Sequence, residues 1–122
     1  MEEKVKIRNF SDLIAWQKAH QLALMIDKVS ENFPTREQFG LSNQMRRASV
    51  SIGPNIAEGF GRGTAKDKTQ FYLVALGSLY ELQSQFYIAR DLGYIGNDGL
   101  IKELSEETGR LISGLIKSTP SR

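Results

Sequence analysis

The chain has 122 residues, of which 40% are hydrophobic and 25% are charged, and its formal net charge is +2. This length suits one domain, and the balance is typical of a folded globular protein rather than a disordered one. The absence of cysteine and the single histidine, His20, exclude disulfides and metal sites built from several such ligands and argue against a metalloenzyme, so we expect no metal and no cofactor.

Helices dominate the predicted structure. Apolar residues recur at intervals of three and four, which is the period of a helix, and turn residues divide the chain into four such segments. We predict an all-α fold, a four-helix bundle that forms one domain over residues 1–122, with its core in residues 10–117 and flexible ends. No apolar run approaches the roughly 20 residues that span a bilayer, so we expect a cytoplasmic protein without membrane contact.

The first helix is predicted over residues 11–33. Ser11 can accept a hydrogen bond from the free amides of the first turn, and Pro34 stops the helix. The apolar residues of this segment form one broad stripe, which we expect to face the core. His20 follows Trp16 by one turn, and we interpret it as a partly buried, hydrogen-bonding residue rather than a ligand or a proton carrier.

The second helix is predicted over residues 41–60, after a short turn in which Thr35 and Gln38 have capping-box spacing. Pro54 offers no amide to the carbonyl four residues earlier, so we expect a kink or a restart near it. The three glycines in residues 59–63 are expected to break the helix. Turn chemistry explains them better than a phosphate-binding loop, because the P-loop spacing and a preceding strand are missing.

The excess of positive charge falls in residues 34–68, which carry six basic and three acidic residues. This segregation predicts a local basic patch that positions the phosphates of RNA or DNA without reading their sequence. The candidate nucleic-acid contacts are Arg46, Arg47, Arg62, Lys66 and Lys68.

A polar stripe on the second helix leaves a structural interpretation open. Glu58 and Arg62 have the spacing of a helical ion pair, and Arg47 can pair with a carboxylate on a neighbouring helix. Asn55 can bond backbone groups that the proline loosens. We therefore keep two interpretations of the arginines, which either contact phosphates or form internal pairs. Ser51, Asn55 and Glu58 are expected to have a structural role.

The third helix is predicted over residues 64–92, from a capping-box pair of Thr64 and Asp67 to a stop at Gly93. It carries two apolar seams, whereas a helix in a four-helix bundle needs one. The second seam indicates either an unusually buried helix or, as we favour, an interface between subunits. The candidate interface residues are Leu73, Leu76, Tyr80 and Tyr87.

The last helix is predicted over residues 97–117, with Asn97 or Asp98 as its N-cap. Thr108 and Gly109 weaken the middle of this helix. Its inward residues recur at helical spacing and are Ile101, Leu104, Leu111 and Leu115.

Several stretches resemble a known family of bacterial four helix bundle proteins, which are encoded by intervening sequences in large-subunit ribosomal RNA genes. The most specific match is NIAEG at residues 55–59, and the resemblance covers roughly residues 10–116. Many relatives place proline directly after the Ser-Ile pair, whereas here Gly53 intervenes before Pro54. The other matching stretches are FSDLIAWQKAH at 10–20, GLSNQMRRASVSI at 40–52, GSLYEL at 77–82 and IARDLGY at 88–94.

The resemblance implies an antiparallel up-down bundle that assembles as a ring-like homopentamer, similar to the accessory variability determinant proteins of diversity-generating retroelements. Those relatives are basic and bind nucleic acid and a reverse transcriptase. This chain is less basic, so that role carries over only to Arg46, Arg47 and Arg62. We hypothesise a non-enzymatic homo-oligomeric bundle that binds structured RNA or DNA. The alternative is a protein–protein interaction scaffold that binds no nucleic acid and whose arginines form internal pairs.

Overall fold

The computed structural model describes residues 6–96 and 99–120, and within them it contains helices and no strand. The expected N-cap at Asn97 or Asp98 and the outermost residues of the predicted flexible ends lie outside the described residues. No helix in the described part of the chain is long and apolar enough to cross a bilayer. The elements are η1 (Phe10–Asp12), α1 (Ile14–Ser30), η2 (Thr35–Glu37), α2 (Leu41–Gly61), α3 (Ala65–Asp91) and α4 (Gly99–Ser118), where η denotes a short 3-10 helix.

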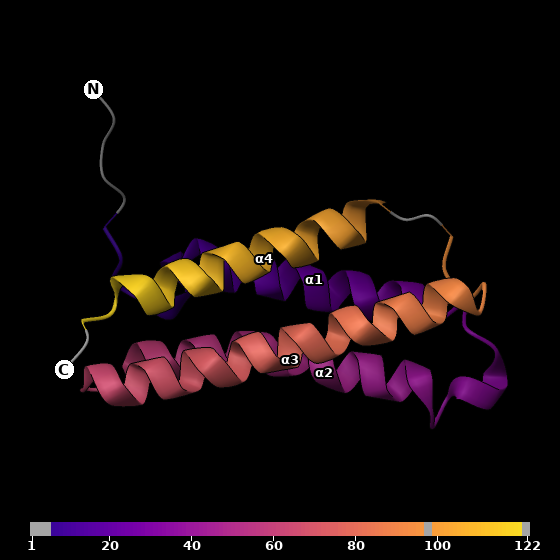
Figure 1. The fold of residues 1–122 in the computed structure, drawn as a ribbon, viewed down its shortest axis with the longest axis horizontal. Coiled ribbons are helices and arrows are strands. Elements are labelled where there is room, and N and C mark those ends of the chain that lie inside the picture. The colour runs from indigo at the N-terminus through magenta and orange to yellow at the C-terminus, as the bar shows by residue number, and fades with distance from the viewer. Residues whose placement is uncertain (1–5, 97–98, 121–122) are drawn as a thin grey trace.

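The four α-helices lie side by side as a four-helix bundle (Figure 1). Each packs against its neighbours in the sequence and α1 also packs against α4, so α2 and α4 occupy opposite corners, as do α1 and α3. Consecutive helices run back and forth along the long axis of the molecule (Figure 1). The predicted all-α fold is confirmed. The largest fully buried apolar side chains are Leu22, Ile26, Met45, Ile52, Ile56, Leu79, Leu82 and Ile112.

Both ends of α1 differ from the prediction. Ser11 lies in the preceding 3-10 helix, where its amide donates to the side chain of Asn9, and α1 begins later without a side-chain cap. At the other end α1 stops at Ser30 rather than Phe33, because the amide of Phe33 bonds the carbonyl of Ser30 in a turn. Local turns on either side therefore shorten the helix.

A carboxylate caps the start of α2. The predicted short turn before it is the 3-10 helix η2, which begins without the expected side-chain cap. Glu37 Oε1 accepts the amide of Leu41 at 3.2 Å, and Glu37 Oε2 accepts the hydroxyl of Tyr94 at 2.8 Å. The bond from the Leu41 amide, followed by that from Tyr94, lowers the pKa of Glu37 below its usual value. The carboxylate thus joins the start of α2 to the turn that follows α3.

The substitution Glu37→Gln is expected to make the free energy of unfolding less dependent on pH in the acidic range. A lowered folded-state pKa means that the charged cap stabilises the fold above the unfolded pKa, about 4.3, and loses this effect as the pH falls through the folded value. The Gln variant should therefore melt lower at neutral pH and lose less on acidification, as circular dichroism would show. Glu103→Gln, at an exposed position of α4, is the control. Equal acid sensitivity in all three proteins would contradict the cap.

The helix α2 continues through Pro54, so the predicted restart does not occur, whereas the kink stays a prediction. Polar side chains make contacts in the helical turn that contains the proline. Asn55 Nδ2 donates to the carbonyl of Ser51 at 2.7 Å, and Ser51 Oγ lies 3.0 Å from Ser78 Oγ on α3. Asn55 therefore adds a bond to the carbonyl next to that of Val50, which Pro54 leaves without its helical donor, and Ser51 joins α2 to α3.

Gly59 lies inside α2 and does not break it, contrary to the prediction. A Cβ at this position would lie 2.7 Å from the ring of Tyr72 and 3.1 Å from the carbonyl oxygen of Lys68. The close approach of α2 and α3 therefore requires the absence of a side chain here. The last residue of α2, Gly61, has nothing within 4 Å of the equivalent position.

Both ends of α3 match the prediction. The N-cap is Thr64, whose Oγ1 accepts the amide of Asp67 at 3.2 Å. After the helix, Gly93 has a φ of +78°, in the left-handed region that favours glycine.

Replacing Gly59 with Ala is expected to destabilise the fold by about 1–3 kcal/mol, because the added methyl group overpacks the contact with Tyr72. Gly61→Ala has open space and a higher helix propensity, so it should change the free energy of unfolding by less than about 1 kcal/mol, in the stabilising direction. Urea unfolding measures both. Equal effects of the two substitutions would contradict the proposed role of Gly59.

Candidate nucleic-acid interface and apolar surfaces

The structure does not bring the five candidate cations together. Arg46 and Arg47 lie in the second turn of α2, whereas Arg62, Lys66 and Lys68 surround the turn between α2 and α3. At 1.5 Å per residue, Arg47 and Arg62 are about 22 Å apart along the helix axis. The predicted basic patch is therefore two separate groups on one side of the bundle.

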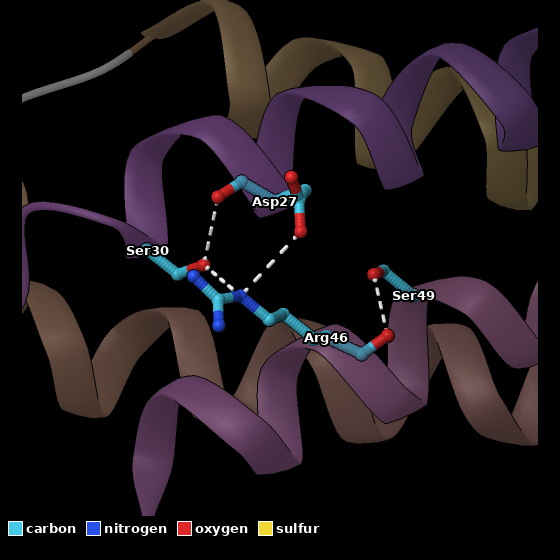
Figure 2. A network of polar contacts seen from close by, with 4 residues as sticks. All are labelled: Asp27, Ser30, Arg46 and Ser49. Carbon is cyan, nitrogen blue, oxygen red and sulfur yellow. Dashed lines mark hydrogen bonds and ion pairs between the residues drawn. The ribbon is translucent and has the colours of Figure 1, made fainter. Parts of the chain in front are cut away.

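Arg46 joins α2 to α1 (Figure 2). Its Nε donates to Ser30 Oγ at 2.8 Å and lies 3.6 Å from Asp27 Oδ1. Ser30 is buried, and its hydroxyl donates to the carbonyl of Asp27 at 3.0 Å. The two terminal nitrogens of Arg46 make no hydrogen bond or ion pair within residues 6–96 and 99–120. Arg46 is thus an interhelical contact with part of its guanidinium still unpaired.

Arg62 and Lys68 are held at the end of α2. Arg62 Nη2 lies 2.6 Å from Glu58 Oε1, and its guanidinium lies over the ring of Phe71, 4.5 Å from the centroid. Lys68 Nζ donates to the carbonyl of Phe60 at 2.6 Å, where the helix dipole favours a cation. Both side chains therefore help to fasten α2 to the start of α3.

Arg47, Lys66 and Arg62 are the exposed cations of the set, and of these Arg62 is paired with Glu58. Arg47 and Lys66 are the two that remain. In the described part of the chain, neither makes a hydrogen bond or an ion pair. The pairing with a carboxylate of a neighbouring helix, considered for Arg47, is made instead by Arg46. An anion can thus approach Arg47 and Lys66 without displacing an internal partner.

His20 is exposed, so its predicted partial burial is wrong. Its imidazole stacks on the indole of Trp16, with ring centroids 4.8 Å apart and an interplanar angle of 14°. Phe10 meets the same indole edge-on at 5.2 Å. On the α2 side Gly53 borders the indole, and a Cβ at this position would make an ordinary contact of 3.4 Å with Trp16 Nε1.

These rings form one end of an apolar groove of about 490 Å³ between α1 and α2, which we call the α1–α2 groove. Trp16 and Ala23 belong to the apolar stripe of the first helix that was predicted to face the core, and the groove was not predicted. The unusual breadth of the apolar stripe on the first helix is the signal that could have indicated it. The side chains that line the groove include Trp16, His20, Ala23, Leu24, Val50 and Pro54.

The second seam of α3 is not covered within one chain. Leu76 packs partly against the core, but the other three candidates are exposed, and two further apolar residues lie beside them. We call the exposed set the α3 ridge, and its members are each between 42% and 56% exposed. The members are Leu73, Val74, Tyr80, Tyr87 and Ile88.

These features define a small helical bundle with two exposed apolar surfaces and dispersed cations. The chain belongs to the family of 23S rRNA-intervening sequence proteins, whose sequence profile matches residues 11–117, which confirms the predicted family. A solved structure of a protein of unknown function from the S23 ribosomal protein family of Bacteroides thetaiotaomicron has the same fold. The TM-score is 0.79 at 23% sequence identity, over 86% of this chain and 100% of that chain. No curated protein matches the chain.

Adjacent arginines are expected to respond differently to substitution. Arg46→Ala removes the charged donor of a partly buried hydrogen bond and should lower the free energy of unfolding by about 1–2 kcal/mol. Arg47→Ala, one residue along the same helix, removes no such contact and should change the free energy of unfolding by less than about 0.5 kcal/mol. Chemical unfolding of both variants checks this difference, and a larger loss for Arg47→Ala would contradict the assigned contacts.

Proposed function

We propose that the chain is a non-enzymatic, homo-oligomeric bundle that acts in the cytoplasm and binds structured RNA through phosphate contacts. The observation that carries this proposal is the pair of exposed cations, Arg47 and Lys66, which have no counterion in the described part of the chain. Both belong to the segment that holds the excess of positive charge. Arg46, Arg62 and Lys68 add to the local potential, although their side chains are held by neighbouring helices.

The spacing of the free cations favours backbone contact over base recognition. Arg47 and Lys66 lie more than about 20 Å apart along the bundle, so they reach separate phosphates of one folded RNA. Few contacts per chain mean weak, salt-dependent binding. The family description names 23S rRNA intervening sequences, which supports RNA as the partner.

Association of copies would strengthen this weak binding. The α3 ridge supports association, because an exposed apolar face of this extent is typical of an interface. We propose a homopentamer, as the resemblance implies. A closed assembly repeats the two free cations on every subunit, and such multivalent contacts raise the overall affinity.

The second candidate function is a protein–protein interaction scaffold without nucleic-acid binding. The exposed apolar surfaces favour it, as does the internal contact that Arg46 makes. Assembly of the chain together with no RNA binding at low salt would support this function over the first one.

The double substitution Arg47→Glu and Lys66→Glu is expected to weaken RNA binding on the order of tenfold or more, and to reduce its salt dependence, because phosphate contacts are lost. Fluorescence anisotropy of a labelled RNA hairpin measures both effects. The matched control is Lys102→Glu with Lys117→Glu, which makes the same charge change on α4, across the bundle from α2. Equal losses in the two double variants would indicate a general charge effect and contradict the assignment to α2 and α3.

A further inference from the structure

We propose that the α3 ridge of one copy of this chain docks into the α1–α2 groove of the next copy, so that the subunits associate head to tail. This inference rests on the homo-oligomeric part of the proposed function. It adds the identity of the two surfaces that meet and the direction of the contact.

Both surfaces are apolar, and both are uncovered in the single chain. At the groove, Leu24 is 60% exposed and Val50 is 58% exposed, on either side of a floor that includes Ala23. The ridge on α3 exposes five large apolar side chains. Covering either surface removes apolar area from water, and covering one with the other removes both at once.

The shapes and lengths of the two surfaces are complementary. The groove is a concave seam between two helices, and its wall on α1 runs from Trp16 to Asp27, about 16 Å. The ridge is the convex side of one helix and runs from Leu73 to Ile88, about 22 Å. Between the large side chains of the ridge, Gly77 has open space above it, so the helix backbone can approach a partner closely.

The unpaired polar groups on the two surfaces also match. The indole N–H of Trp16 faces the groove region and makes no hydrogen bond with the described residues. The hydroxyls of Tyr80 and Tyr87 on the ridge likewise have no partner there. Tyr and Trp combine an apolar body with one polar tip, which suits a buried interface in which donor and acceptor meet.

The apolar lining favours a second copy over RNA as the occupant of the groove, and the two surfaces also carry one pair of opposite charges. The terminal nitrogens of Arg46 are unpaired beside the groove, and Glu81 on α3 is an exposed carboxylate whose partner is the neutral Gln85. A docked copy would bring these opposite charges onto one interface. A phosphate could meet the same arginine, but only the ridge of a second copy would also cover the exposed apolar side chains of the groove, Leu24 and Val50.

The arrangement of helices sets the direction of the contact. α3 occupies the corner opposite α1, so its exposed ridge faces away from the groove of its own chain. Two different surfaces therefore meet, and every copy keeps one free groove and one free ridge for further copies. Such a heterologous contact generates a ring when its rotation closes.

Three single substitutions at exposed apolar positions test the docking. Leu24→Asp in the groove and Tyr80→Asp on the ridge should each convert the assembly to single chains, as measured by light scattering after size exclusion, with an unchanged helical circular dichroism signal. Phe39→Asp is the control, because Phe39 is 87% exposed and lies outside both surfaces. If only Tyr80→Asp dissociates the assembly, the ridge meets another surface and the proposal is overturned. If Leu24→Asp keeps the mass but loses RNA binding, RNA occupies the groove and the proposal is overturned as well.

Cysteine cross-linking tests the head-to-tail direction in a chain that has no native cysteine. Val50 lies in the groove, and Ser84 is an exposed residue of α3 between the ridge residues Tyr80 and Tyr87. With a short bis-maleimide, the double variant Val50→Cys and Ser84→Cys should give a ladder of cross-linked chains, whereas each single variant should stay uncross-linked. Cross-linking of Ser84→Cys alone would show that two ridges meet face to face. An assembled wild type with no ladder overturns this inference alone, whereas a wild type that is a single chain at all concentrations overturns the homo-oligomeric part of the proposed function too.

Discussion

The close packing of α2 against α3 is the constraint on which the other features depend. It requires a hydrogen atom in place of a side chain at Gly59, where the ring of Tyr72 occupies the space. Burial in this contact raises the pKa of Tyr72. The same contact places Lys68 on the terminal carbonyls of α2 and joins Ser51 to Ser78. Because α3 turns this face inward, its opposite face, with the ridge, remains exposed.

The two adjacent arginines of α2 show how helix geometry separates roles. Successive residues differ by about 100° around the axis, so Arg46 faces α1 while Arg47 lies in solvent. One side chain holds the bundle together, and the other has a free charge. The basic character of this segment is therefore divided between stability and surface potential, which a count of charges does not reveal.

The periodicity of the sequence was sufficient to predict the four helices, both ends of α3 and the exposed seam on it. These features depend on local chemistry, such as the Thr64 cap and the left-handed Gly93, or on an excess of apolar residues over what one core needs. The cap of α2 and the role of Gly59 were not predicted, because both depend on contacts between distant segments. The cap of α2 involves Tyr94, more than fifty residues away, and the role of Gly59 follows from Tyr72 on another helix.

The candidate site was predicted only in part, for the same reason. Sequence spacing identified the Glu58 and Arg62 pair, because both residues lie on one helix. It could not indicate that Arg46 meets Ser30, or that the two groups of cations lie at different heights on the bundle. The groove was missed because a stripe of apolar residues at helical spacing has the same pattern whether it faces a core or an open seam.

The only tryptophan of the chain, Trp16, lies in the α1–α2 groove beneath the ring of His20. Indole emission shifts with the polarity of its surroundings, and no second tryptophan contributes to the signal. The native protein therefore contains an intrinsic fluorescent reporter at this one location. The wavelength of its emission reports the hydration of the groove without any added label.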